Sequence, residues 1–296
     1  MPFVGEISAL ATACCWTASS IVFAAATMRV GSVYVNVTRL TAAALILLLV
    51  VAAVRIPVDV SFSQAGHLFV SGLVGLVFGD TFLFKSYEYN SARISSLIMS
   101  TAPALTAILG YLFLGETLSL PGITGMVITL AGISLVVLER REHSSTAMHT
   151  SLIGIFYAFL GSIGQAGGLI LAKGAFVEGP INGFVATLIR MLAAVIVILP
   201  LAIAAKRYTR PVSVFSHDRR ALIHTMLGTI FGPVLGVTAS LIAVAHTKTA
   251  IAATLMATVP IIMLPTVRFV EKERLTWRAI AGAWIAVGGV IILFLR

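Results

Sequence analysis

The sequence has very little charge. Only 10% of its 296 residues are charged and 59% are hydrophobic, and the mean hydropathy is +1.05. An average soluble domain has about a quarter of its residues charged. A water-exposed surface cannot be covered with so few polar side chains, which excludes a soluble globular protein. The chain is therefore expected to be a membrane protein that functions inside the bilayer.

Cysteine and enzymatic motifs are also scarce. The only cysteines, Cys14 and Cys15, are adjacent within an apolar run, so they give no disulfide framework. The sequence has no H-E-x-x-H, no G-x-S-x-G and no Walker phosphate loop, and its six histidines lack metal-ligand spacing. We therefore expect no enzyme activity, no catalytic residue, no metal site, no cofactor and no ATP-driven pump.

Long apolar runs make up most of the chain. A bilayer core roughly 30 Å thick requires about 20 apolar residues per helix. Runs of this kind, bounded by charge, proline or glycine, predict an all-α membrane protein with ten transmembrane helices. The ten predicted spans are 5–27, 32–54, 66–84, 91–114, 121–138, 150–172, 182–204, 222–244, 249–270 and 276–295.

The basic residues predict the orientation of these spans. Connections after the first, third, fifth, seventh and ninth spans hold fourteen Lys and Arg, whereas the other side has only Arg55, Lys173, Lys248 and Arg296. Because cytoplasmic loops are rich in Lys and Arg, we expect both termini outside the cytoplasm in a multi-pass protein of the cell (inner) membrane. The net charge of +9 is then explained by membrane orientation, and no nucleic-acid partner is expected.

The sequence also contains an internal repeat. Two pentapeptides, MSTAP (99–103) and MATVP (256–260), lie 157 residues apart, and the same offset pairs residues over nearly sixty positions. Examples are Gly75/Gly232, Gly79/Gly236, Thr81/Thr238, Glu116/Glu273, Gly125/Gly282 and Gly132/Gly289; Arg39 matches Arg190 at an offset of 151. The repeat predicts two five-helix units, 1–138 and 150–296, joined by a polar linker, 139–149. An odd number of spans per unit makes this an inverted repeat, the arrangement that permits alternating access.

A proline followed thirteen residues later by a glutamate occurs in both units. Pro103 is followed by FLGETL (113–118) and Pro260 by VEKERL (270–275). With Trp16, Arg39 and Arg190, this pattern resembles the EamA-type units of the drug/metabolite transporter superfamily. The resemblance implies a ten-helix transporter that moves small metabolites outward through a cavity lined by helices 1, 3, 4, 6, 8 and 9. The second unit departs from the pattern, with Lys272 where the first has Gly115 and with no Trp in the sixth span.

The repeated prolines are candidates for the transport path. A proline has no N–H to donate, so Pro103 and Pro260 each leave a carbonyl free, that of Met99 or Met256. The recurrence, with Thr101 and Thr258 beside the prolines, favours a hinge or a lining role. The alternative is that the kinks only help the helices to pack.

Charged residues within the predicted spans are further candidates. Arg39 and Arg190 lie well inside their helices, where an arginine either binds a substrate carboxylate or serves as a structural residue near the interface. Asp80 is the only Asp within a span, and the apolar Val237 occupies its counterpart position. It is expected to contact a substrate amine, pair with one of the arginines, or carry a proton.

Less specific candidates complete the predicted path. Tyr157 and Gln165 share a helical stripe with two glycines, which fits a cavity wall and a tight helix contact equally well. A single Trp or His near a helix end, such as His246, is usually an interface anchor. The candidate path comprises Trp16, Arg39, Asp80, Met99, Thr101, Pro103, Tyr157, Gln165, Arg190, Met256, Thr258 and Pro260, with Lys85, Glu88 and His246 as weaker candidates.

Two functions of different class remain open. The first is a secondary transporter, in the exporting direction, of small metabolites such as amino acids or related amphiphilic compounds. The alternative is a non-transporting integral membrane protein, either an assembly partner or an intramembrane enzyme. The repeat favours the transporter, because a scaffold needs no inverted symmetry. The expected partners are a small-molecule substrate and the lipid bilayer. The sequence leaves undecided whether the protein forms a homodimer.

Overall fold

The computed structural model describes residues 3–90, 92–138, 151–269 and 277–295, and all regular elements in these ranges are helical. The predicted linker 139–149 and the positions of Lys272 and Glu273 lie outside the described residues. The first half contains α1 (Val4–Val30), α2 (Ser32–Val54), α3 (Phe62–Gly72), the π-helix η1 (Leu73–Gly79), α4 (Asp80–Ser86), α5 (Ala92–Met99), α6 (Ala102–Leu114) and α7 (Leu120–Leu138). The second half contains α8 (Leu152–Glu178), α9 (Gly183–Ala204), α10 (Pro211–His217), α11 (Arg219–Thr229), the π-helix η3 (Ile230–Gly236), α12 (Val237–His246), α13 (Thr249–Met256), α14 (Val259–Phe269) and α15 (Trp277–Leu295).

Seven of these helical segments are long and apolar enough to cross a membrane, and three more are apolar but shorter. The shorter ones are 120–136, 249–264 and 280–295. Each lies in one of the predicted spans, except that the first begins one residue before the span 121–138. Large apolar side chains such as Leu49, Phe113 and Trp284 are more than two-thirds exposed on the outer faces, where lipid would cover them. The prediction of an all-helical, multi-pass membrane protein is confirmed.

Polar caps and glycines set several helix boundaries. The Ser61 hydroxyl accepts from the Gln64 N–H while the Gln64 side chain accepts from the Ser61 N–H, a reciprocal capping box at the start of α3. Asn182 caps α9 and Asp218 caps α11 in the simpler one-way manner. At the turn between α1 and α2, Gly31 has a φ of 87°, a conformation that favours glycine.

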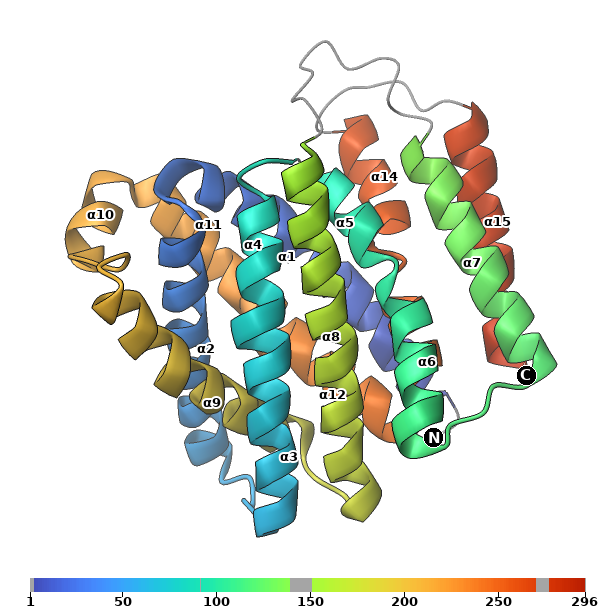
Figure 1. Ribbon diagram of the computed structural model, residues 1–296, viewed down its shortest axis with the longest axis horizontal. Helices are drawn as coiled ribbons and strands as arrows, with labels where there is room; N and C mark the ends of the chain where they lie inside the picture. The colour runs from blue at the N-terminus through green and yellow to red at the C-terminus, as the bar shows by residue number, and fades with distance from the viewer. Residues whose placement is uncertain (1–2, 91, 139–150, 270–276, 296) are drawn as a thin grey trace.

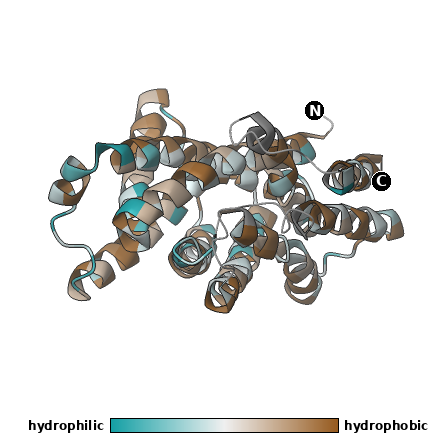
Figure 2. Ribbon diagram, turned by 90° about the horizontal axis from the view of Figure 1, so that it is seen from above, coloured by the Kyte–Doolittle hydropathy of each residue, from teal (hydrophilic) through white to brown (hydrophobic). Residues whose placement is uncertain are grey.

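Both termini lie at the same end of the helical bundle, the lower end in Figure 1. We call this the terminal end, and we call the opposite end, where α7 ends and α8 begins, the linker end. Figure 2 shows brown, hydrophobic residues on helices throughout the bundle, with a hydrophilic stretch at the left around α10. Membrane-facing apolar surfaces thus surround the bundle, and polar residues gather around a connection at one side.

The last helices of the two halves pack against each other. Figure 1 shows α7 and α15 side by side at one edge of the bundle, and α7 makes its main contact with α15. A Cβ added to Gly125 would lie 3.0 Å from the Gly289 carbonyl oxygen, and one added to Gly282 would lie 2.9 Å from the Gly132 carbonyl oxygen. These four glycines, interpreted from the sequence as a packing face, lie at this contact.

The internal repeat is visible in the structure as π-helices and helix breaks at equivalent positions of the two halves. The π-helices η1 and η3 are both seven residues long and begin 157 residues apart, at Leu73 and Ile230. The breaks between α5 and α6 and between α13 and α14 are separated by the same offset. Pro103 and Pro260 are each the second residue of a new helix, a position where the missing N–H is tolerated. Each proline therefore marks the start of a separate helix after a break.

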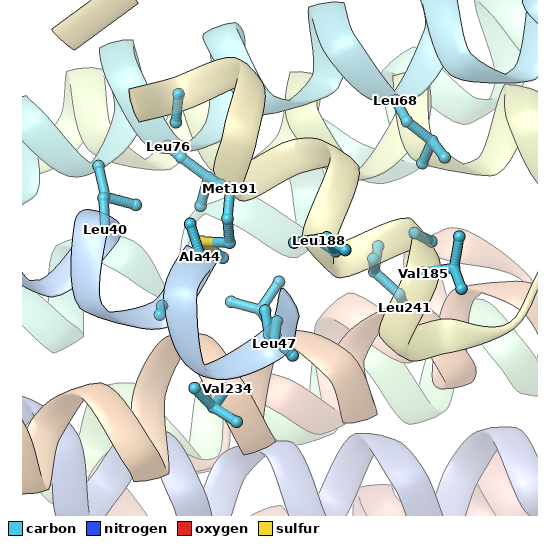
Figure 3. Close-up of a cluster of buried hydrophobic side chains, with 14 of the residues drawn as sticks. Leu40, Ala44, Leu47, Leu68, Leu76, Val185, Leu188, Met191, Val234 and Leu241 are labelled. Atoms are coloured by element: carbon cyan, nitrogen blue, oxygen red, sulfur yellow. The ribbon is translucent and has the colours of Figure 1, made fainter. Parts of the chain in front are cut away.

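A buried apolar cluster holds the elements that carry the two arginines. Leu40, next to Arg39 on α2, and Met191, next to Arg190 on α9, are both fully buried in it. Figure 3 shows these side chains, with Leu47 of α2 and Val185 and Leu188 of α9, converging with one residue each of α3, η1, η3 and α12: Leu68, Leu76, Val234 and Leu241. This packing fixes α2 and α9 against the π-helices. It therefore also fixes the backbone positions of Arg39 and Arg190.

Candidate substrate cavity

A cavity of about 130 Å³ lies in the centre of the bundle and is lined by both halves of the chain. On α1 the described lining residues run from Trp16 to Phe23, that is, from the middle of the helix toward the linker end. The third span lines it as far as Tyr87, also near that end. The charged residues in its described lining are Arg39, Asp80 and Arg190.

Arg39 has several partners within the protein. Its guanidinium forms an ion pair with Asp80, and its Nε and Nη2 donate to the Asn36 Oδ1 at 3.0 and 2.9 Å. The guanidinium also lies 4.5 Å from the centre of the Phe84 ring, a cation–π distance. Asn36 in turn donates to the Thr81 hydroxyl at 3.2 Å. The sequence left open whether Asp80 pairs with an arginine, and in the structure it pairs with Arg39.

Arg190 has a different environment. It is only 3% exposed, its Nε has no hydrogen-bond partner in the described part of the chain, and its side chain lines the cavity. A Cβ added to Gly75 would lie 2.8 Å from the Arg190 Nη2, and one added to Gly168 would lie 3.4 Å from it. Two glycines from different helices therefore make the space that this guanidinium occupies.

Glycines also bring α8 very close to η1. A Cβ added to Gly164 would lie 2.7 Å from the Gly79 nitrogen, and one added to Gly168 would lie 2.9 Å from the Gly75 Cα. The sequence left a cavity wall and a tight helix contact equally open for the stripe that holds Gly161, Gln165 and Gly168, and a Cβ added to Gly161 would lie 3.3 Å from the Gly79 carbonyl oxygen. The structure places the glycines in the contact and Gln165 in the lining of the cavity.

Several other candidates also line the cavity. Trp16 lies on its α1 side, with the indole against η3, where a Cβ added to Gly236 would lie 2.7 Å from the indole Cδ1. Met99 and Pro103 line it at the break between α5 and α6, and Met256 lines it at the equivalent break in the second half. Both repeated breaks therefore reach the cavity.

The remaining candidates lie outside the described lining of the cavity. Thr101 is exposed and its hydroxyl is 2.9 Å from that of Ser162 on α8. The Thr258 hydroxyl donates to the Leu255 carbonyl at 2.7 Å, and Pro260 follows it in the first turn of α14. Tyr157 stacks with Phe82, with ring centres 5.8 Å apart.

The weaker candidates also lie elsewhere. His246 is at the end of α12, with Nδ1 2.9 Å from the Ile242 carbonyl oxygen. Lys85 forms an ion pair with Glu88, which also accepts from the Ser32 N–H at 2.8 Å. Burial raises the pKa of Glu88, but the hydrogen bonds from Lys85 and Ser32 outweigh it, so the pKa is lowered from its usual value. This pair joins α4 to the start of α2.

Sequence reasoning did not single out several residues of the cavity. The lining includes hydroxyl and aromatic side chains that were not predicted: Ser19, Ser20, Phe23, Phe84, Tyr87, Ser96, Ser100 and Ser240. One signal was available, because Trp16, Ser19, Ser20 and Phe23 occupy positions i, i+3, i+4 and i+7 and so share one face of α1. The residues on α4 and α5 had no comparable pattern.

At the terminal end, polar contacts join the two halves beneath the cavity. Glu116 accepts from the Thr249 N–H at 2.8 Å and from its hydroxyl at 2.9 Å. The Lys248 ammonium donates to the Thr117 carbonyl, and the Glu6 carboxylate accepts from the Thr247 hydroxyl at 3.1 Å. We call Glu116, Thr117, Lys248 and Thr249 the terminal latch. It holds the α6–α7 connection against the start of α13.

At the linker end, different residues join the halves. Arg29 pairs with Asp218 at 2.6 Å, and the Tyr34 hydroxyl donates to the Thr209 carbonyl at 2.8 Å. Hydrogen bonds from the Ala221 N–H and from Arg29 lower the pKa of Asp218. These contacts are around α10 and α11, at the edge of the bundle opposite α7 and α15 (Figure 1).

Comparison with known proteins agrees with this arrangement. The EamA-like transporter family matches residues 3–138 and again residues 152–295. The chain belongs to the EamA-like transporter family. The resemblance seen in the proline and glutamate pattern is confirmed.

Individual relatives match shorter stretches. The uncharacterized transporter YxxF of Bacillus subtilis is 30% identical over 125 residues, which cover 42% of this chain and 39% of that protein. The multidrug resistance protein EbrB of the same organism is 31% identical over 84 residues, which cover 27% of this chain and 71% of EbrB. The chain thus spans less than half of the length of the first relative.

One solved crystal structure shares the whole fold. It covers 99% of this chain and 96% of its own, with a TM-score of 0.75 and 14% sequence identity. At this identity the likeness shows the fold alone.

Proposed function

We propose that this EamA-like transporter exports small amphiphilic metabolites, such as amino acids or related compounds, as a secondary transporter. One observation carries the proposal. The central cavity is lined by both halves, and its described lining includes two arginines and one aspartate. Ionisable side chains at this depth of a membrane protein are costly and mark substrate or ion pathways. The apolar remainder of the lining suits an amphiphilic molecule.

We further propose that all ten apolar helical segments cross the membrane as two inverted five-helix units that alternate access to the cavity. Three features support this proposal. The two family matches divide the chain in the middle, both termini lie at one end of the bundle, and the π-helices and helix breaks recur at one offset. Inverted units of this kind can exchange conformations and so open one site to each face in turn.

The charge distribution supports an orientation for the proposed cycle. Basic residues such as Arg29, Arg207 and Arg219 lie in or beside the connections at the linker end, which supports a cytoplasmic linker end with both termini on the outer side of the cell membrane. The cavity extends toward the linker end, and the terminal latch joins the halves at the other end. The conformation is then one that receives substrate from the cytoplasm, as an exporter requires.

The alternative, a non-transporting membrane protein, is less well supported. A scaffold or assembly partner has no need of buried charges around a central cavity, since they lower stability unless a ligand or an ion uses them. An intramembrane enzyme would need a nucleophile or a metal beside a base, and the described residues contain no group of three or more metal-ligating side chains.

Transport by the purified protein in liposomes tests the proposal. A panel of amino acids, aromatic acids and cationic amphiphiles would be loaded inside, and release would be followed with and without an imposed proton gradient. We expect saturable, protein-dependent release of at least one compound. Liposomes without protein control for passive leakage. If folded protein releases no compound of the panel above that background, the transporter proposal is wrong.

A further inference from the structure

Two arginines line the central cavity, but in the described part of the chain only Arg39 forms a direct ion pair with an acid. Asp80 pairs with Arg39, whose guanidinium is also hydrogen-bonded to Asn36. Arg190 is 97% buried, and no hydrogen bond or ion pair reaches its guanidinium from the described residues. Within the described lining, Asp80 is the only acid. The cavity therefore has one positive charge that these side chains do not balance.

A buried arginine without a counter-charge favours binding of a negatively charged ligand. A charge removed from water without a partner is strongly destabilising, and more so at the depth of a membrane. The planar fork of a guanidinium matches the two oxygens of a carboxylate in a bidentate pair. Gly75 and Gly168 leave space for the Arg190 Nη2, and the Arg190 side chain lines the cavity.

The single unbalanced positive charge in the cavity limits the charge that the ligand can carry. A monocarboxylate brings one negative charge, which matches Arg190. A phosphate group brings about −1.5 to −2 at neutral pH and so exceeds what one arginine balances. A zwitterionic amino acid brings no net charge, and its ammonium group would compete with Arg39 for Asp80. The balance favours a carboxylate without a free amine.

The rest of the lining indicates the size and polarity of the part of the ligand that carries no charge. Trp16, Phe84, Met99 and Met256 give the cavity large aromatic and thioether surfaces. Its volume of about 130 Å³ is close to that of an engineered cavity of about 150 Å³ that holds benzene. A single ring or a short branched chain therefore fits beside the carboxylate.

We propose that the cavity binds a small apolar monocarboxylate without a free amine, such as an aromatic or branched-chain acid, with its carboxylate on Arg190. This proposal rests on the proposed function, because it assumes that the cavity is the substrate site, and it narrows the substrate to one chemical class. The Arg39–Asp80 pair stays intact when such a ligand binds, because Arg190 alone balances the negative charge of the carboxylate.

Three compounds that share one phenyl ring and one short chain test the charge requirement. They are 3-phenylpropanoate, phenylalanine and 2-phenylethylamine, which carry the acid alone, both groups, and the amine alone. Binding to the full-length protein in detergent would be measured by titration calorimetry at pH 7.5. We expect 3-phenylpropanoate to bind about tenfold or more tightly than phenylalanine and 2-phenylethylamine to show no measurable binding. Tighter or equal binding of phenylalanine or the amine, or no binding of the acid, overturns the proposal.

Variants test the role of Arg190 itself. Arg190→Gln should weaken binding of 3-phenylpropanoate about 10- to 100-fold, whereas Arg207→Gln, which removes an exposed cation at the linker end, should leave it unchanged. If Arg190→Gln does not fold, Gly75→Ala serves instead, because its Cβ would displace the Arg190 Nη2 and should also weaken binding. Undiminished affinity in the folded variant overturns the proposal.

The outcomes separate this proposal from the proposed function. If other compounds are transported and the acid does not bind, the transporter proposal is supported and the carboxylate-site proposal is wrong. If the acid binds in an Arg190-dependent manner and no compound is transported, the site stands and the transporter proposal is wrong.

Discussion

The indole of Trp16 lies against Gly236, the last residue of η3, and Gly164 lies against Gly79, the last residue of η1. The two contacts are equivalent. Both α1 and α8 have 27 residues, and Trp16 and Gly164 are each the thirteenth. A large side chain separates the helices in one contact, and glycine brings the backbones together in the other. This difference in side-chain volume explains why Trp16 lines the central cavity while Gly164 is in a tight helix contact.

We expect Gly164→Ala to destabilise the protein by about 1–3 kcal/mol, because overpacking a tight contact forces side chains or backbone to shift. The added Cβ would lie 2.7 Å from the Gly79 nitrogen. Thermal unfolding in detergent measures the change. Gly66→Ala on α3 is the matched control, since that Cβ meets nothing within 4 Å and should be neutral or slightly stabilising. Equal effects of the two substitutions would contradict the tight contact.

Asp80→Asn should abolish transport and reduce stability. Removing the carboxylate leaves the buried Arg39 guanidinium without its counter-charge, and breaking a buried pair in this way costs about 3–5 kcal/mol. The double variant Arg39→Met with Asp80→Asn removes both charges and should recover most of the stability without recovering transport. Transport rates in liposomes and thermal unfolding give the two readouts. Full transport by Asp80→Asn, with unchanged pH dependence, would rule out a role for the pair in the transport cycle.

Glu116→Ala should open the terminal end of the cavity more often. It removes both hydrogen bonds from Thr249, and hydrogen bonds to a charged group contribute about 1.5–3 kcal/mol each. A reporter cysteine, Ser100→Cys, would be placed in the lining of the cavity in a chain that also carries Cys14→Ser and Cys15→Ser. Labelling of intact cells by a membrane-impermeant maleimide should accelerate at least about tenfold.

The control for the latch is Asp59→Ala, which removes an exposed acid from the connection between α2 and α3. It should leave the labelling rate unchanged. If Glu116→Ala also leaves the rate unchanged while the protein remains folded, the contacts at Glu116 do not hold the terminal end closed.

Pro103→Ala and Pro260→Ala should slow turnover more than they weaken substrate binding. Alanine restores an N–H at the start of α6 or α14 and favours a continuous helix by up to about 3 kcal/mol relative to proline, so the break would be less available for movement. Turnover and affinity would be measured separately in liposomes and in detergent. Pro121→Ala, at the exposed start of α7, is the control. A larger loss in affinity than in turnover would point to a static lining role.

The sequence was sufficient for the coarse architecture, because lengths of apolar runs and the 157-residue offset are properties of the chain itself. The break after Met99 was also predictable, since proline acts locally. The π-helices were not predicted. They change the hydrogen-bond partner by one residue over a short stretch and leave the apolar pattern almost unchanged.

The site was predicted in part for a similar reason. Arg39, Asp80 and Arg190 stand out because charge is rare in these helices, but sequence alone could not decide which arginine takes the aspartate. That choice depends on the packing of α2 and α9 in the apolar cluster around Leu40 and Met191. Tyr157 shares a helical stripe with Gln165, but its ring stacks with Phe82 and lies outside the described lining of the cavity.

The glycine contacts between α7 and α15 affect how the protein is assembled. Each of these helices ends its own half, yet α7 makes its main contact with α15, and Gly125, Gly132, Gly282 and Gly289 lie where the backbones meet. If either half were absent, the other would be left with a helix whose closest packing surface is uncovered. The halves are therefore interdependent, and the smallest piece of this chain with a complete interior is the pair.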